Sequence, residues 1–170
     1  MNYLNKLFSI FLIFFLYTNT SFSNEPVAYI DIDFILKNSE IGKKSLEKIN
    51  TQNNLNIQDL KKKEKILKDL EIEIASKKKI ISKEAFEKEV NIFRKNVDQF
   101  KIEQKQIIKD FNDYKKKEID KVLQTISPII NSYMEQKSVK ILFDAKNIFM
   151  ARNDLNLTND IIEAINKEVK

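Results

Sequence analysis

The segment FEKEVNIFRKNVDQF repeats apolar residues at steps of four, three, four and three, and nearly every residue between them is charged or an amide. The apolar positions are Phe86, Val90, Phe93, Val97 and Phe100. The pattern runs on to Tyr114 with one break, at Gln104. In an α-helix this spacing gathers the apolar side chains into one narrow seam. The seam therefore predicts a long helix that needs a partner along its whole length.

An earlier segment supplies that partner. From Lys43 to about Ile74 the chain has no Gly and no Pro. A heptad frame fits Leu46, Ile49, Leu60, Leu67, Leu70 and Ile74, with polar residues at Asn53, Asn56 and Lys63. The segment 75–82 interrupts the pattern, and Ser82 is a suitable N-cap for the second helix, from Lys83 to about Ile126. We expect the first helix to begin after an N-cap at Ser39.

The N-terminus has the features of a secretory signal peptide. Lys6 precedes an apolar run of 11 residues, and Ser21-Phe22-Ser23 offers small residues for cleavage after Ser23. A membrane anchor is the alternative, but the run is shorter than the roughly 20 residues that span a bilayer. We predict a signal peptide over 1–23 and a single mature domain over 24–170, exported to the periplasm.

The length of the second helix makes it project. At about 1.5 Å per residue it is on the order of 65 Å long, whereas a globule of the mature size has a radius of gyration of roughly 15 Å. We therefore predict an antiparallel helical hairpin, a coiled-coil arm over 43–126, standing on a body of 24–42 and 127–170.

The body is predicted from short strands at both ends of the arm. Val27–Asp33 and Val139–Ala145 read as strands, and Ile148–Ala151 reads as a third that forms a hairpin with the second. Pro128 should kink the helical pattern or mark a joint. A final helix should begin with Thr158 as its cap, with Ile161, Ile162, Ile165 and Val169 on one face. The fold class is thus α+β, with a small antiparallel β body.

Composition excludes several function classes. There is no Cys and no His, and there is one Gly. Thiolate chemistry, the commonest general base and Gly-rich phosphate loops are therefore missing, so we predict no enzyme and no cofactor. Asp31, Asp33 and Asp144 are interpreted as strand-end caps and turn acceptors. With two arginines and export from the cytoplasm, nucleic-acid binding is not expected.

Charge separates the arm from the body. Residues 43–126 hold 22 basic and 15 acidic side chains, whereas the rest of the mature chain holds 7 and 10. The longest cationic stretch without an acid lies where the hairpin turns and contains Lys77, Lys78, Lys79 and Lys83. It is either a solvated turn or a contact site for an acidic polypeptide or anionic lipid headgroups. Phe86 and Phe93, near the tip, either pack inside the hairpin or touch the same ligand.

The chain contains a VAYID strand, the segment SEIGKKSL, a turn near IISKEAF, and LFDA followed by LTNDIIEAINKEV. Together these motifs resemble the OmpH-like family of periplasmic chaperones, the Skp type. The resemblance implies a homotrimer whose three arms surround a cavity that holds unfolded outer-membrane β-barrel proteins, without nucleotide. Asn and Lys at seam positions of the first arm helix depart from the family pattern. A structural coiled-coil spacer of the cell envelope is the alternative function.

Overall fold

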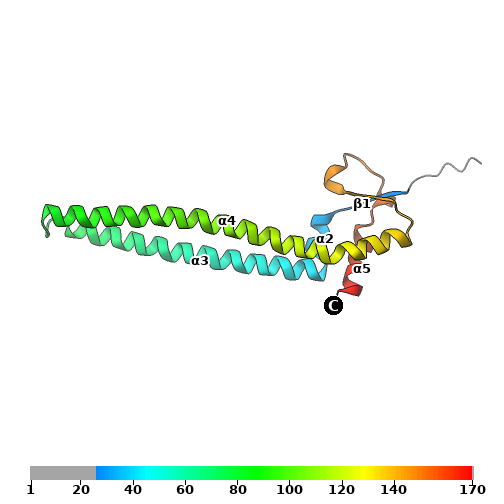
Figure 1. Cartoon of the computed structure of the whole chain (residues 1–170), viewed down its shortest axis with the longest axis horizontal. Helices are drawn as coiled ribbons and strands as arrows, with labels where there is room; N and C mark the ends of the chain where they lie inside the picture. Colours follow the sequence, from blue (N-terminus) through cyan, green and yellow to red (C-terminus); the bar gives the residue numbers. More distant parts are fainter. Residues whose placement is uncertain (1–25, 170) are drawn as a thin grey trace, which may run out of the picture.

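A computed structural model describes residues 26–169 as a long two-helix arm on a small body (Figure 1). The elements follow the order β1 (Val27–Ile30), α2 (Ile32–Asn38), α3 (Glu40–Lys77), α4 (Lys83–Gln136), β2 (Ile141–Asp144), the 3-10 turns η1 (Ala145–Asn147) and η2 (Asn153–Leu155), and α5 (Thr158–Glu168). The 54 residues of α4 correspond to about 80 Å. The predicted projecting hairpin is confirmed.

Both arm helices begin at the predicted serines. The side chain of Ser39 accepts a hydrogen bond from the amide of Gly42, and that of Ser82 accepts one from Ala85, each at 3.2 Å. An N-cap oxygen satisfies one of the helix-start amides that have no partner within the helix. Each helix extends beyond the predicted range, because α3 continues to Lys77 and α4 continues to Gln136.

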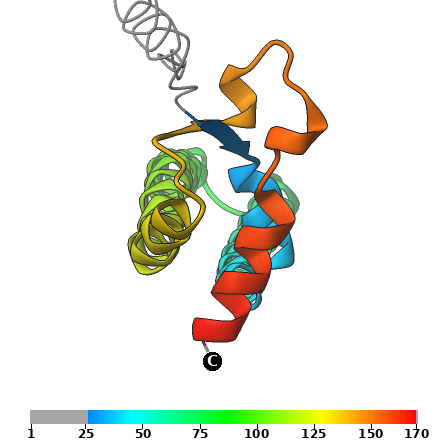
Figure 2. The same cartoon turned by 90° about the vertical axis from the view of Figure 1, so that its right-hand side faces the viewer.

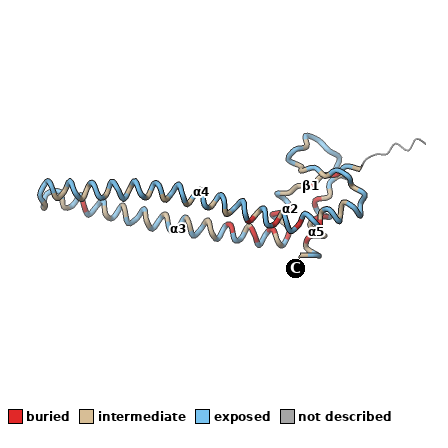
Figure 3. The backbone as a smooth tube through the Cα atoms, viewed as in Figure 1, coloured by how far each residue is buried: buried red, intermediate tan, exposed pale blue. Residues whose placement is uncertain are grey.

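The seam between α3 and α4 is only half-buried along most of the arm (Figure 3). The side chains of Phe86, Phe93 and Phe100 are half-buried at seam positions that face α3, as the stripe predicted. Between Ile49 and Ile74 on α3, no residue is fully buried, and the same holds for α4 from Lys83 to Lys117. Two helices alone cannot enclose a seam, so each apolar side chain keeps one edge in solvent.

The fully enclosed core lies at the base of the arm, where pieces from both ends of the chain meet. Its buried members are Ile30, Ile35, Leu36, Val122, Ile126, Ile129, Ile161 and Ile165. They come from β1, α2, α4 and α5, and the end view shows α5 below β1 (Figure 2). The body therefore depends on the lower part of α4 as well as on its own short elements.

The predicted antiparallel β body is wrong. β1 pairs with β2 in parallel, with Val27 opposite Ile141 and Ile30 opposite Asp144. The connection between β1 and β2 contains α2 and both arm helices. It is long enough for β2 to enter the body in the same direction as β1. The third strand, Ile148–Ala151, is absent from the described residues, because η1 turns the chain away from β2 directly after Asp144. Instead Asn156 makes an isolated parallel bridge to Tyr29.

The first strand is also shorter than predicted. It ends at Ile30 because Asp31 caps α2 by accepting a hydrogen bond from the amide of Phe34 at 2.9 Å. Asp33 lies within α2 and forms an ion pair with Lys146 at 2.7 Å. Asp144 is a cap as predicted, since it accepts from the amide of Lys146 at the start of η1.

Thr158 has a different role from the predicted cap. It is the first residue of α5, whose N-cap, Leu157, makes no side-chain hydrogen bond. The Thr158 hydroxyl accepts from the amide of Asp31 at 2.9 Å and donates to the side chain of Asn156. It thus connects α5 to the end of β1, a contact between residues 127 positions apart.

Pro128 neither ends α4 nor separates the arm from the body. The helix runs through it to Gln136, and Ile129 directly after it is part of the core. Nearby hydroxyls hydrogen-bond to carbonyls one turn back, from Ser127 to Leu123 and from Thr125 to Lys121. Among residues 26–169, no helix has the length and apolar content of a membrane span. The predicted signal peptide, 1–23, lies outside the described residues.

Candidate functional site

The tip of the arm brings together three of the four predicted lysines. α3 ends at Lys77, and the amides of Ile80 and Ile81 donate to the Lys77 carbonyl, at 2.8 and 3.1 Å, to close the turn. Lys78, Lys79 and Lys83 are exposed around Ile80, which is itself 79 % exposed. The tip therefore presents one isoleucine among three ammonium groups.

Lys77 is separated from the other three by its contacts. Its ammonium group forms ion pairs with Glu73 at 2.7 Å and with Glu89 of α4 at 3.4 Å. The hydrogen bond with Glu73, followed by the charges of both acids, raises the pKa of Lys77. Lys77 thus joins the two helices at the tip, and its charge is already balanced within the arm.

Phe86 and Phe93 lie on the face of α4 that contacts α3, and both rings are half-buried. They are seven residues apart, so about 10 Å of helix separates them. Phe86 is one turn from the exposed lysines of the tip, whereas Phe93 is not part of that cluster. Each ring packs in the seam and also leaves an edge open to solvent.

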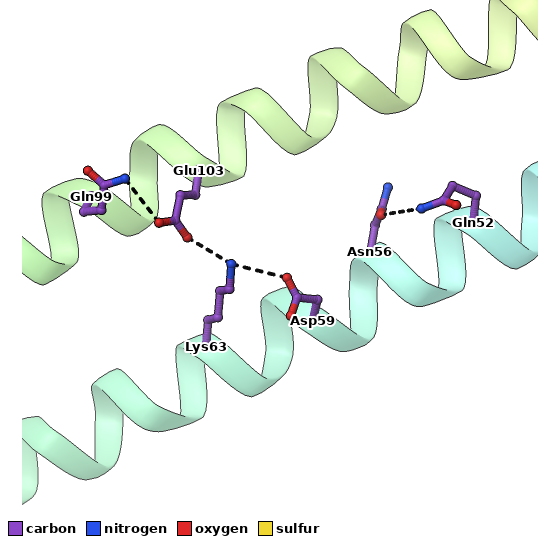
Figure 4. Close-up of polar contacts among 6 residues, drawn as sticks. All are labelled: Gln52, Asn56, Asp59, Lys63, Gln99 and Glu103. Atoms are coloured by element: carbon purple, nitrogen blue, oxygen red, sulfur yellow. Dashed lines mark hydrogen bonds and ion pairs between the residues drawn. The ribbon is translucent and has the colours of Figure 1, made fainter.

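A polar layer interrupts the seam at mid-arm (Figure 4). Lys63, at a seam position of α3, forms ion pairs with Asp59 at 3.3 Å and with Glu103 of α4 at 3.0 Å. Gln99 donates a hydrogen bond to Glu103 at 3.2 Å. The bond to Glu103 is the larger cause of the raised pKa of Lys63, and Lys63 in turn lowers the pKa of Glu103. The sequence marks Lys63 as a break in the seam but does not indicate its partner.

Beside this layer the seam opens into a shallow, mainly apolar groove of about 310 Å³. It is lined by Lys63, Ile66, Leu67, Leu70, Asn96, Gln99, Phe100 and Glu103. Leu70 and Phe100, both half-buried, are among its apolar lining residues. The groove can accept an apolar side chain from another polypeptide, but it is too open to enclose a small molecule.

Isoleucines occur outside the seam of both arm helices, a feature that the stripe analysis did not use. Ile66 and Ile72 on α3 and Ile92, Ile102 and Ile108 on α4 are each more than half exposed. A solvated helix face is usually polar, so these residues are candidates for contact with a partner. The sequence could have indicated these contact candidates, because each is an apolar residue at a position that the heptad frame assigns to the surface.

The acidic side chains of the described body are the remaining candidates for a metal site. Within residues 26–169, no three acidic side chains gather in a way that could hold a metal ion. The three predicted caps, Asp31, Asp33 and Asp144, are each engaged in the cap or ion-pair contacts described above. The described arm presents a long surface of cations and scattered apolar side chains, a combination suited to contact with another polypeptide.

Comparison with known proteins agrees with this architecture. The sequence profile of a family described as "Outer membrane protein (OmpH-like)" matches residues 26–165. A crystal structure from Caulobacter crescentus CB15, assigned as an OmpH-like outer membrane chaperone, superposes with a TM-score of 0.76 at 16 % identity. The superposition covers 85 % of this chain and 86 % of that one. A search of curated proteins gave no match. Because the family profile spans nearly all of the described body and arm, the chain belongs to the OmpH-like family.

Proposed function

We propose that this protein is a periplasmic holdase chaperone that binds unfolded outer-membrane β-barrel proteins and keeps them from aggregating, without ATP. The observation that carries the proposal is the long basic arm, whose isoleucines and phenylalanine edges are open to solvent. A surface that binds unfolded chains lowers their free concentration, and mass action then slows aggregation. Family membership and the predicted signal peptide support the periplasmic location.

The active form is a homotrimer in which three arms surround the client. Apolar side chains on the body support self-association, since Phe149 is 100 % exposed and Met150 is 82 % exposed in the single chain. Phe143 and Ile141 of β2 are also exposed. Surfaces of this kind are uncommon on monomeric proteins and mark contact sites. Three arms together would bring about three times the net positive charge of one arm to the client.

Dilution of a urea-denatured β-barrel outer-membrane protein into buffer containing the mature chain tests this function. We expect turbidity to fall in proportion to the chaperone added and to reach its minimum near one trimer per client. Cytochrome c at equal concentration is the control for a basic protein without an arm. Unchanged turbidity would reject the holdase function and favour a structural spacer. Light scattering at two concentrations tests the trimer, and a single-chain mass at micromolar concentration would reject it.

A further inference from the structure

Basic and acidic residues of α4 occupy different parts of the helix surface over residues 87–117, and the two parts are called here the basic side and the acidic side. One side carries eight basic and two acidic residues: Lys88, Arg94, Lys95, Lys101, Lys105, Lys109, Lys115 and Lys116, with Glu87 and Asp98. The other carries one basic and four acidic residues: Lys117, with Glu89, Glu103, Asp110 and Asp113. The seam positions between the two sides hold no charge. Relative to the seam, at about 100° per residue, the basic set covers the outer face of α4 and one flank, and the acidic set lies along the other flank.

The two sides differ in what they contact. On the acidic side, Glu89 and Glu103 are half-buried and form the two cross-helix ion pairs of the described arm, with Lys77 and Lys63. On the basic side, every residue named above is exposed, and the recorded ion pair joins Lys101 to Asp98 of the same helix. The acidic side therefore holds the hairpin together, whereas the basic side is free for a partner.

Two isoleucines lie within the basic side. Ile102 is 62 % exposed and Ile108 is 53 % exposed, and lysines precede and follow both along the surface. Cations around exposed apolar side chains complement a polypeptide that carries carboxylates and unburied apolar residues together. A folded protein rarely displays both in one extended segment, because its apolar side chains are buried.

We propose that the basic side of α4 is the client-binding surface of the arm, and that its ligand is an unfolded polypeptide of acidic character. The inference rests on the proposed holdase function and assigns it to one side of one helix. The acidic side, with its two cross-helix ion pairs, then joins the helices of the hairpin. Client contact by the basic side is electrostatic and apolar at once, so it requires no fixed sequence in the client.

The test compares two triple variants of the mature chain that remove the same charge. K95Q/K105Q/K109Q changes three exposed lysines of the basic side, and K48Q/K62Q/K117Q changes three exposed lysines on the acidic flank of the hairpin. None of the six forms an ion pair among the described contacts. The probe is a fluorescently labelled, urea-denatured β-barrel protein of acidic pI, and circular dichroism checks that both variants keep their helices.

We expect the basic-side variant to bind the probe about tenfold more weakly, because three modest exposed ion pairs with the client are lost, and the control variant less than about twofold more weakly. The wild type should lose affinity with rising salt more steeply than the basic-side variant. A second pair of variants tests the apolar contribution: I102S/I108S should weaken binding of the probe more than I66S/I92S, which changes two exposed isoleucines on the acidic flank.

Three results would overturn this surface assignment while leaving the holdase function intact. They are equal weakening by both charge variants, no weakening by either when the wild type binds, and an effect confined to vesicles of phosphatidylglycerol tested in parallel. The first would mean that net charge alone matters, and the last would make the basic side a membrane-contact surface. Failure of the wild type to bind the denatured probe would instead reject the holdase function itself.

Discussion

At the scale of single residues, the one glycine has a specific structural role. Gly42 lies in the first turn of α3, where the chain leaves α2, and it is buried. A methyl group added there would overlap the backbone carbonyl of Leu36. Because that oxygen is on the main chain, the overlap cannot be relieved by turning a side chain. The residue is required for the close approach of α2 and α3.

We predict that Gly42→Ala lowers the free energy of unfolding by about 1–3 kcal/mol, the usual range for overpacking in a core. Ala is the better helix former, so intrinsic propensity alone would predict a gain. Urea denaturation followed by circular dichroism measures the change. Lys44→Ala, on the exposed face of the same turn, is the control and should be neutral. A stabilised Gly42→Ala variant would show that α2 can move away from α3.

Thr158 is the second residue whose role depends on a distant contact. We predict that Thr158→Val destabilises the body by about 1–3 kcal/mol, because the amide of Asp31 loses its hydrogen-bond acceptor. The side chains have nearly the same volume, so packing is preserved. Thr125→Val removes an exposed hydroxyl contact within α4 and should change stability by less than about 0.5 kcal/mol. Equal effects of the two changes in a thermal melt would contradict the prediction.

At the scale of elements, the seam of the arm contains polar residues and is only half-buried. Asn56 occupies a seam position and accepts a hydrogen bond from Gln52 at 3.0 Å. Beside it a second groove is lined by Ile107, Phe111 and Tyr114. Polar seam residues reduce the apolar area that the two helices bury, and they also fix the register in which the helices pair.

We predict that Asn56→Leu stabilises the arm by about 1 kcal/mol, since the new side chain buries apolar area against the two rings. Slower hydrogen exchange of α3 amides between residues 50 and 63 would be the direct readout. Asn54→Leu, on the exposed face of α3, should give no gain. If both variants behave alike, the seam at this level is not packed as described.

At the scale of the whole molecule, four carboxylates within residues 26–169 have lowered pKa values because each contacts a cation. The nearest cause is Lys146 for Asp33, Lys63 for Glu103, Lys121 for Glu118 and Arg152 for Asp154. A carboxylate whose folded pKa is lowered stabilises the fold above its unfolded value of about 4, and that stability is lost as the pH falls through the folded value.

We therefore predict that the urea midpoint is flat between about pH 5 and 8 and falls below about pH 4, where these carboxylates begin to take up protons. The Glu103→Gln variant should show a smaller acid-induced fall in its midpoint than the wild type, since it has no carboxylate to protonate. A midpoint that rises on acidification would show that repulsion among acidic residues, rather than their pairing with lysines, controls the pH dependence.

Self-association is also a property of the whole molecule. Phe149→Ser combined with Met150→Ser should reduce the mass measured by light scattering at low micromolar concentration, because it removes the most exposed apolar side chains of the body. Ile80→Ser at the arm tip is the matched change, and it should leave the mass unaltered. An unaltered mass in the double variant would move the subunit contact to another part of the body.

The sequence by itself determined the arm. Helix periodicity and serine caps are local signals, so the apolar stripe, Ser39 and Ser82 sufficed to predict two projecting helices, a turn near Lys77 and a body made from both chain ends. The same reasoning predicted both helices too short at their C-terminal ends. The continuation of α4 past Pro128 is stabilised by core contacts of Ile129 and not by helix propensity.

Tertiary structure alone decided how the body closes and which charges are paired. The parallel pairing of Val27 with Ile141 and the contact of Thr158 with Asp31 each join residues more than 100 positions apart. Sequence pattern specifies which side a residue faces but not which partner it meets. For this reason the expected antiparallel β body was wrong, although the helical hairpin was predicted correctly. The pairing of Lys63 with Glu103 likewise follows from the register of two helices, which is set by the packing of the entire seam.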